Sequence, residues 1–195
     1  RKKFTSIGSA GKPFKGIFDG NGFEIIGLYI DISYVEYQGL FGYADTGSEI
    51  KNLKISGSIA GGNKSGAVAG YTNGLISGCE VNCPVTIAWT HYHGGIAGYA
   101  GVNSIISNCN ASGTIEGSEC VGGIAGYTEG KITECNSDKT ITGVKKVGGI
   151  AGYAAGTGAE ISNCSFSGTV LDVNNFYTGG IAGQTDGLIT GCAVN

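Results

Sequence analysis

The side chains best suited to chemistry are seven cysteines, five of which recur at a nearly constant spacing: Cys79, Cys109, Cys135, Cys164 and Cys192. Stacked strands would place such thiols along a line, about 4.8 Å apart. A disulfide prefers Cβ atoms about 3.8 Å apart, and a zinc site needs ligands that converge on one point. We therefore expect buried thiols that act as small apolar side chains, and no metal or other cofactor. Cys83 and Cys120 lie outside this series and are expected to be free thiols.

The only tryptophan and both histidines lie together in the segment Trp89–His93. This segment is one of several variable stretches, among them Asn63-Lys64 and Lys145-Lys146, that each precede a glycine of a repeated string. These stretches are expected to lie above one another on one edge of the molecule, and loops on a rigid scaffold are common recognition sites. The predicted ligand-binding residues are Trp89, His91, Tyr92, His93, Tyr34, Tyr37, Phe176 and Tyr177. The alternative is a longer corner whose aromatic rings cover the core. Two histidines without a third ligand are weak evidence for a metal site.

Tyrosine also recurs once per repeat, at Tyr43, Tyr71, Tyr99, Tyr127 and Tyr153. These rings are expected to stack on one side of the molecule, where each ring shields the next turn. The alternative is a strip of flat aromatic faces that binds sugar rings.

The acidic residues favour no catalytic site. A glycosidase needs two carboxylates that face one cleft, whereas the carboxylates here are scattered along the chain. The net charge is −3 and Arg1 is the only arginine, so the basic stripe that nucleic acid requires is missing. The sequence has no apolar run of about 18 residues. We therefore expect no enzyme, no nucleic-acid partner and no membrane insertion.

All of these residues are positioned by a repeated string, glycine-glycine-isoleucine-alanine-glycine-tyrosine. It occurs as Gly94–Tyr99, Gly122–Tyr127 and Gly148–Tyr153, with weaker copies on both sides. Successive copies start 27, 29, 28, 26 and 31 residues apart, a period typical of stacked repeats. The apolar positions alternate as in strands, and each glycine would cost a helix about 1 kcal/mol. The sequence predicts an all-β fold, a parallel β-solenoid of about seven rungs with about 28 residues and three short strands per rung.

Two details of the repeats are predicted as well. The first repeat is read from Gly16, which aligns Ile17 with Leu40 and Ile25 with Ile50. A sharp corner in the left-handed conformation is expected just before each leucine or cysteine of the repeat. The residues there are Gly27, Asn52, Gly78, Asn108, Glu134, Asn163 and Gly191. Glycine and asparagine adopt that conformation most readily, so Glu134 is the exception.

The repeats carry a family resemblance. The Gly-Gly-Ile-Ala-Gly-Tyr string alternates with Gly-x-Ile-x-x-Cys, and Phe18–Gly22 precedes Ile26–Leu28. This pattern resembles the GLUG-motif repeats of bacterial surface proteins, over residues 16–195. Similar repeats occur in large secreted or wall-attached adhesins and in the non-catalytic part of IgA-specific metallopeptidases. The resemblance implies an extracellular, right-handed solenoid with an adhesive or spacer role. The sequence has no HExxH zinc motif, so no peptidase activity carries over.

These observations lead to one hypothesis with two alternatives. We expect a single solenoid over residues 1–195, with 1–15 as an irregular lead-in. We also expect the chain to be a fragment of a longer protein. Its expected role is a non-catalytic adhesin module or rigid spacer outside the cell or at a bacterial cell surface. Its expected partner is a glycan or a host extracellular protein. One alternative is a polysaccharide-active lyase or hydrolase, and the other is a filament subunit that self-associates end to end.

Overall fold

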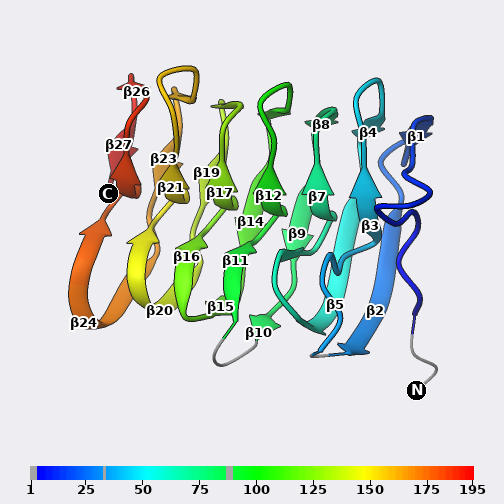
Figure 1. Cartoon of the computed structure of the whole chain (residues 1–195), viewed down its shortest axis with the longest axis horizontal. Coiled ribbons are helices and arrows are strands. Elements are labelled where there is room, and N and C mark those ends of the chain that lie inside the picture. The colour runs from blue at the N-terminus through cyan, green and yellow to red at the C-terminus, as the bar shows by residue number, and fades with distance from the viewer. Residues whose placement is uncertain (1–3, 33, 87–89) are drawn as a thin grey trace.

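The computed structural model describes residues 4–32, 34–86 and 90–195. Within these ranges the chain forms 27 strands and no helix, and neighbouring strands pair in parallel. Successive turns lie side by side along one axis, with the termini at opposite ends (Figure 1). The chain is therefore an all-β parallel solenoid of about six turns, which repeat about every 28 residues. No helix of the described residues is long and apolar enough to cross a membrane.

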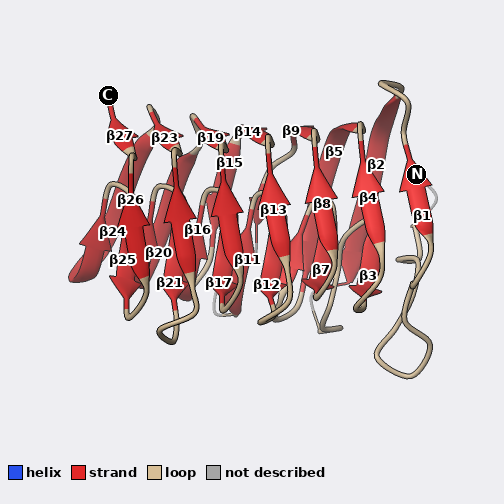
Figure 2. Cartoon of the chain, turned by 90° about the horizontal axis from the view of Figure 1, so that it is seen from above, coloured by secondary structure: helices blue, strands red, loops and turns tan. Residues whose placement is uncertain are grey.

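Two narrow sheets form part of each turn, and Figure 2 shows their strands in rows. The isoleucine sheet has seven strands, in the order β1 (Ile17–Asp19), β4 (Glu49–Lys51), β8 (Leu75–Ser77), β13 (Ile105–Ser107), β18 (Lys131–Thr133), β22 (Glu160–Ser162) and β26 (Leu188–Thr190). The tyrosine sheet has six strands, which are β3 (Phe41–Ala44), β7 (Ala69–Thr72), β12 (Ala97–Ala100), β17 (Ala125–Thr128), β21 (Ala151–Ala154) and β25 (Ala182–Thr185).

The remaining strands belong to one wide sheet of 14 strands. Its first segment contains β2 (Glu24–Ile32), β5 (Lys54–Gly61), β9 (Glu80–Asn82), β14 (Asn110–Ser112), β19 (Asn136–Ser137), β23 (Ser165–Phe166) and β27 (Ala193–Val194). Its second segment contains β10 (Val85–Thr86), β15 (Thr114–Glu116), β20 (Thr140–Gly148) and β24 (Thr169–Gly179). Its third segment contains β6 (Ser65–Gly66), β11 (His91–Gly94) and β16 (Glu119–Gly122). A central turn thus has five short strands where the sequence predicts three, because bends divide the wide sheet.

The predicted alignment of the first repeat is wrong. Ile17 pairs with Glu49 and Phe18 with Ile50, while Ile25 pairs with Ile55 instead of Ile50. The reason is packing, since the ring of Phe18 lies 5.4 Å from that of Phe41 while Ile17 is 67% exposed. In the described part of the chain, this first turn has no strand of its own in the tyrosine sheet. The lead-in residues take that place, because Ile7 pairs with Phe41 and Phe14 with Ala44 of β3.

The core consists of columns of like side chains, one from each turn. Register-paired isoleucines of the isoleucine sheet, such as Ile76, Ile106 and Ile132, have no exposed surface. Each isoleucine buried in this way stabilises the fold by about 1.5–3 kcal/mol. A single turn has no partner for these side chains, so the stacking of turns is what forms the core.

The glycine pair of the repeated string is required by close backbone contact between turns. A Cβ atom on Gly95 would collide with the carbonyl oxygen of Gly123 in the next turn, and one on Gly94 would collide with that of Ala97 in its own turn and that of Ile124 in the next. Main chains of adjacent turns therefore meet where side chains would otherwise separate them.

A row of corner residues connects the isoleucine sheet to the wide sheet, and we call it the corner row. It consists of Asn52, Gly78, Asn108, Glu134, Asn163 and Gly191, with φ between 52° and 61°. The predicted left-handed corner is confirmed at all six positions, and Glu134 adopts it too, with φ 53°. Gly27 also has a positive φ, of 74°, but it lies at a register shift inside β2.

Among the residues that the structure describes, one charged side chain lies inside the core. Lys139 has no exposed surface, and its ammonium group donates hydrogen bonds to the carbonyl oxygens of Cys83 at 2.9 Å and Ser112 at 2.5 Å. Burial lowers the pKa of this lysine to about 8. The side chain extends over Gly95, whose missing Cβ leaves room for it. Lys139 thus connects three successive turns through their main chains.

Candidate binding edge of aromatic and basic side chains

The tyrosines of the tyrosine sheet form a continuous stack. Tyr43, Tyr71, Tyr99, Tyr127 and Tyr153 pair in register, one on each strand. The ring centroids of the first four lie 4.1, 5.5 and 4.5 Å apart with interplanar angles of 19° to 22°. Tyr153 meets Tyr127 edge to face at 5.3 Å. The predicted ladder is therefore present, and we call it the tyrosine ladder.

A second row of left-handed residues runs beside this ladder, and we call it the edge row. It consists of Tyr37, Lys64, Tyr92, Cys120, Lys146 and Tyr177, with φ between 55° and 66°. The pairing of the following residues stacks these six positions from turn to turn. The left-handed conformation costs a residue with a side chain about 1–2 kcal/mol, so the surrounding contacts must hold it in place.

Those contacts come from the tyrosine ladder. The ring of Tyr37 lies edge-on to Tyr43 at 5.4 Å and to Tyr71 at 6.4 Å. The ring of Tyr92 lies edge-on to Tyr99 at 6.0 Å and to Tyr127 at 5.6 Å. The rings of Tyr37 and Tyr92 therefore each rest on two ladder rings, and each aromatic contact adds about 0.5–1.5 kcal/mol beyond burial.

The two lysines of the edge row contact the same aromatic system. The Lys64 ammonium lies 4.6 Å from the centre of the Tyr37 ring and donates a hydrogen bond of 3.0 Å to its hydroxyl. The Lys146 ammonium lies 4.3 Å from the centre of the Tyr153 ring. A cation over an aromatic face is attracted by the ring quadrupole. The edge row and the tyrosine ladder together form one surface, which we call the binding edge.

Carboxylates balance the lysines along the binding edge. Lys64 lies 3.6 Å from Glu36, and Glu119 lies 3.1 Å from Lys145 and 3.5 Å from Lys146. Tyr71, Tyr99 and Tyr153 stay protonated at neutral pH. Burial raises the pKa values of Tyr71 and Tyr99, and a hydrogen bond to Asp186 raises the pKa of Tyr153 to about 12.

The two histidines of the predicted site differ in their surroundings. The side chain of His93 is fully buried, its Nε2 lies 2.7 Å from the Thr90 hydroxyl, and burial lowers its pKa to about 4. His91 is half-buried, and its backbone N–H donates a hydrogen bond of 2.9 Å to the Asn63 side chain. Trp89 lies outside the described residues. Among the described residues, no three side chains of histidine, cysteine, aspartate or glutamate gather as metal ligands would.

The other predicted site residues divide between the binding edge and its surroundings. Tyr37, Tyr92 and Tyr177 are members of the edge row, and Phe176 pairs with Lys145 beside it. Phe176 and Tyr177 are 58% and 56% exposed. Tyr34 is 88% exposed in the turn before Tyr37 and lies outside the row. The sequence placed Lys64 and Lys146 in the variable stretches expected on one edge, but it did not reveal the left-handed conformation that they share with Tyr37 and Tyr92. The available signal was their position two residues before a glycine.

Comparison with known protein families matches the central turns. Residues 90–116, 117–142 and 145–171 each match the model described as the GLUG motif. Three turns of the solenoid carry the GLUG motif. Each match begins near the edge row and includes the glycine pair, a tyrosine of the ladder and a cysteine.

A curated relative shares these repeats. Halomucin from Haloquadratum walsbyi is 35% identical over 97 residues, which is 49% of this chain and 1% of that protein. The chain thus corresponds to a very small part of halomucin. No solved structure matches the chain.

The thiols of the cysteine column, which recur once per turn, are structural. Cys79, Cys109, Cys135 and Cys164 are buried and form no disulfide. The Cys109 thiol donates to the carbonyl of Ser107, two residues back, at 3.2 Å, and Cys135 and Cys164 repeat this geometry at 3.3 Å. A cysteine therefore fills the core and gives the carbonyl before the left-handed corner, which already accepts a backbone hydrogen bond, a second donor that a leucine lacks.

The two cysteines outside that column are free and buried too. Burial raises the pKa of Cys83 to about 11 and that of Cys120 to about 12. The thiolate is the reactive form of cysteine, and both residues hold almost none of it at neutral pH. Neither position therefore has the environment of a nucleophile.

Proposed function

We propose that this chain is a non-catalytic module of a cell-surface or secreted protein, and that its binding edge adheres to a glycan or to an extracellular host protein. The observation that carries the proposal is the edge row. Tyrosines occupy a costly left-handed conformation there, and backbone strain of this kind is concentrated at functional sites. The corner row shows that the same fold accepts glycine or asparagine where only the backbone matters.

The physical basis of binding would be preorganisation. The rings of Tyr37 and Tyr92 each rest on two ladder rings, so they lose little conformational freedom when a partner binds. Tyrosine offers a flat apolar face and a hydroxyl, which suits both sugar rings and protein surfaces. The edge row changes from turn to turn, so selectivity would come from the order of its side chains.

The matches to known repeats support a module in a longer surface protein. GLUG turns cover residues 90–116, 117–142 and 145–171, and the likeness to halomucin spans only 1% of that protein. A column of buried side chains shared by all turns makes the solenoid a stiff rod. A rod of this kind would hold the binding edge at a fixed orientation.

A binding screen tests this proposal. The purified chain is applied to a glycan array and to a panel of extracellular matrix proteins, beside the variants Tyr92→Ala and Tyr37→Ala. We expect saturable binding that both variants weaken about ten-fold or more, because each removes a ring held by two others. The matched control is Phe23→Ala, an aromatic residue that is 72% exposed away from the binding edge. A folded chain that binds neither panel would overturn adhesion and favour a rigid spacer.

A further inference from the structure

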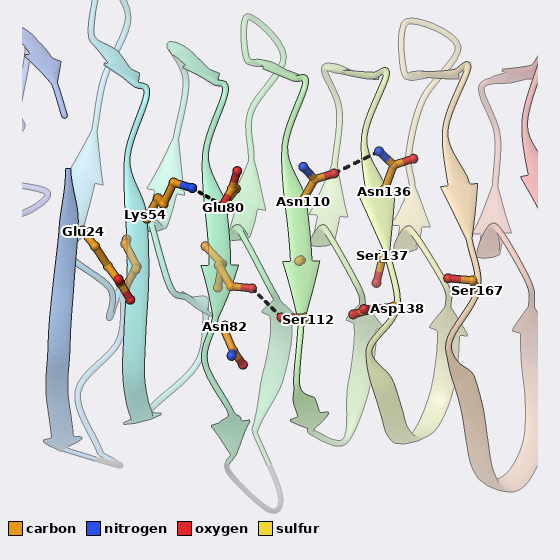
Figure 3. Close-up of a pocket in the computed structure, with 13 residues that line it drawn as sticks. Glu24, Lys54, Glu80, Asn82, Asn110, Ser112, Asn136, Ser137, Asp138 and Ser167 are labelled. Carbon is orange, nitrogen blue, oxygen red and sulfur yellow. Dashed lines mark hydrogen bonds and ion pairs between the residues drawn. The ribbon is translucent and has the colours of Figure 1, made fainter. Parts of the chain in front are cut away.

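A groove of about 600 Å³ crosses the first segment of the wide sheet (Figure 3). It shares no residue with the binding edge. Sites for small molecules typically enclose about 300–1,000 Å³, so this groove is of ligand size. It extends over the turns that contain β2, β5, β9, β14, β19 and β23. Because neighbouring strands lie about 4.8 Å apart, a groove that crosses six strands is about 24 Å long.

The groove has two walls of outward-facing side chains and a floor of main chain. The upper wall is one register row: Glu24, Lys54, Glu80, Asn110 and Asn136. The lower wall lies two residues further along the same strands: Asn82, Ser112, Asp138 and Ser167. Residues between the walls, such as Val81 and Ala111, point into the core and are 3% exposed. Strand alternation therefore repeats the same cross-section in every turn.

The upper wall is held in place by its own contacts. Lys54 and Glu80 form an ion pair of 2.8 Å, and the Asn136 amide donates a hydrogen bond of 2.9 Å to the Asn110 side-chain carbonyl. These contacts order the wall, and they use the Asn110 side-chain carbonyl while its amide nitrogen is left as a donor. An ordered wall loses less entropy when it binds a ligand.

The lower wall is anchored from behind by the buried lysine. Lys139 donates to the carbonyls of Ser112 and Cys83, the latter directly after Asn82. Among the residues drawn in Figure 3, the side chains of Asn82, Asp138 and Ser167 bond to no neighbour. The lower wall thus presents an amide, a carboxylate and a hydroxyl on a main chain that is fixed from inside.

We propose that this groove binds a neutral, hydroxyl-rich linear glycan that lies along the solenoid axis. Amides and hydroxyls can both donate to and accept from sugar hydroxyls, carboxylates accept from them, and a repeated cross-section suits a repeated polymer. The walls contain three carboxylates, Glu24, Glu80 and Asp138, against one lysine, which is already paired with Glu80. A polyanionic chain is therefore repelled. The floor has no apolar pocket for the side chains of a peptide, since its residues are buried.

Titration with defined oligosaccharides tests the groove. The probes are the neutral hexasaccharides of cellulose, mannan and starch, with the hexamer of galacturonic acid as the anionic comparison. Backbone amide shifts of the whole chain are followed by NMR. We expect at least one neutral hexasaccharide to shift amides of β9, β14 and β19, and the galacturonic acid hexamer to have no effect there.

Substitutions then locate the contacts. Asn82→Ala and Asn110→Ala each remove an exposed amide and are expected to weaken binding about ten-fold. The matched control is Asn103→Ala, an exposed asparagine in the loop between β12 and β13, which should bind like the parent chain. Tyr92→Ala should also bind like the parent here, so loss at the binding edge and loss at the groove are separable.

Three results would overturn the groove proposal. These are the absence of shifts with every neutral hexasaccharide, unchanged affinity in both groove variants, and equal binding of the anionic hexamer. Each of them leaves the screen of the binding edge unaffected, because that screen depends on Tyr37 and Tyr92.

Discussion

The corner row and the edge row are two columns with nearly the same backbone conformation and opposite residue choice. In the corner row φ lies between 52° and 61°, and five of its six residues are glycine or asparagine. In the edge row φ lies between 55° and 66°, and its residues are tyrosine, lysine and cysteine. The backbone requirement is thus equal, so the difference must come from the side chains.

The difference shows that backbone conformation alone selects the residue type in the corner row, whereas side-chain contacts select it in the edge row. Corner-row side chains such as Asn108 and Glu134 are exposed and serve mainly to turn the chain. Edge-row side chains meet the tyrosine ladder, so Tyr37 and Tyr92 offset their backbone strain with ring contacts. Substitutions that separate backbone from side-chain effects should therefore act in opposite directions in the two rows.

Lowering the pH should destabilise the edge row before it destabilises the corner row. This is the largest effect that we expect. His93 lies next to Tyr92 and has its pKa lowered from 6.5 to about 4 by burial. In the unfolded chain His93 binds its proton at a higher pH than in the folded chain. The stability contributed by the neutral His93 ring is therefore fully present above pH 6.5 and is lost as the pH falls toward 4. The full loss is about 3 kcal/mol.

The structural reason is the surroundings of the His93 ring. Its Nδ1 is buried without a partner among the described residues, and its Nε2 lies beside the Thr90 hydroxyl. A protonated ring would have one buried N–H without an acceptor, close to His91. Amide exchange should show β11 losing protection between pH 6.5 and 4 before the corner row does. His93→Leu should remove this dependence and His91→Gln should keep it, and equal acid sensitivity in both rows would contradict the explanation.

A β-branched residue in the corner row should be the most destabilising single substitution there. Asn108→Val places a branched side chain at φ 52°, which we expect to cost about 2 kcal/mol. Asn108→Gly keeps the conformation accessible and should change stability little. Urea unfolding of the two variants measures the difference. If valine were tolerated as well as glycine, the corner would not be set by its backbone.

The same glycine test should give the opposite result in the edge row. Tyr92→Gly relieves the strain at φ 66° but removes ring contacts with Tyr99 and Tyr127. Each contact contributes about 0.5–1.5 kcal/mol beyond burial, so we expect a net loss of about 1 kcal/mol. Tyr92→Phe keeps the ring and should retain stability. A stabilising Tyr92→Gly would mean that the ladder does not hold the edge row.

The structural features that could be predicted from the sequence are those in which one residue type recurs once per turn. The solenoid, the isoleucine columns and the tyrosine ladder were visible because one residue type recurs once per turn, as in Ile106 and Ile132. The corner row was visible for the same reason, since glycine and asparagine mark it. The variable stretches were expected on one edge, but the left-handed conformation of the edge row was missed because that conformation recurs while the residue types vary.

Features that occur once had no such signal. Lys139 stands alone in the core because Gly95 leaves space for it, and only the three-dimensional stack places these two residues together. Phe18 took the isoleucine position of the first turn because its ring packs on Phe41. The groove was missed as well, because the residue types along its walls vary from turn to turn although their positions repeat.

Glu134 provides the smallest and cleanest test of the comparison. It is the one corner-row residue that is neither glycine nor asparagine, it has φ 53°, and its side chain is exposed. Glu134→Gly should therefore stabilise the chain by about 1 kcal/mol, less the entropy that a glycine adds to the unfolded state. Glu134→Asn should give a smaller gain without that entropy term. The free energy of unfolding in urea measures both, with Glu116→Gly on β15 as the matched control. Glu116 lies in a strand without a positive φ, so glycine there should destabilise the chain. If Glu134→Gly destabilised the chain as Glu116→Gly does, the left-handed corner would not be the property that selects residues in this row.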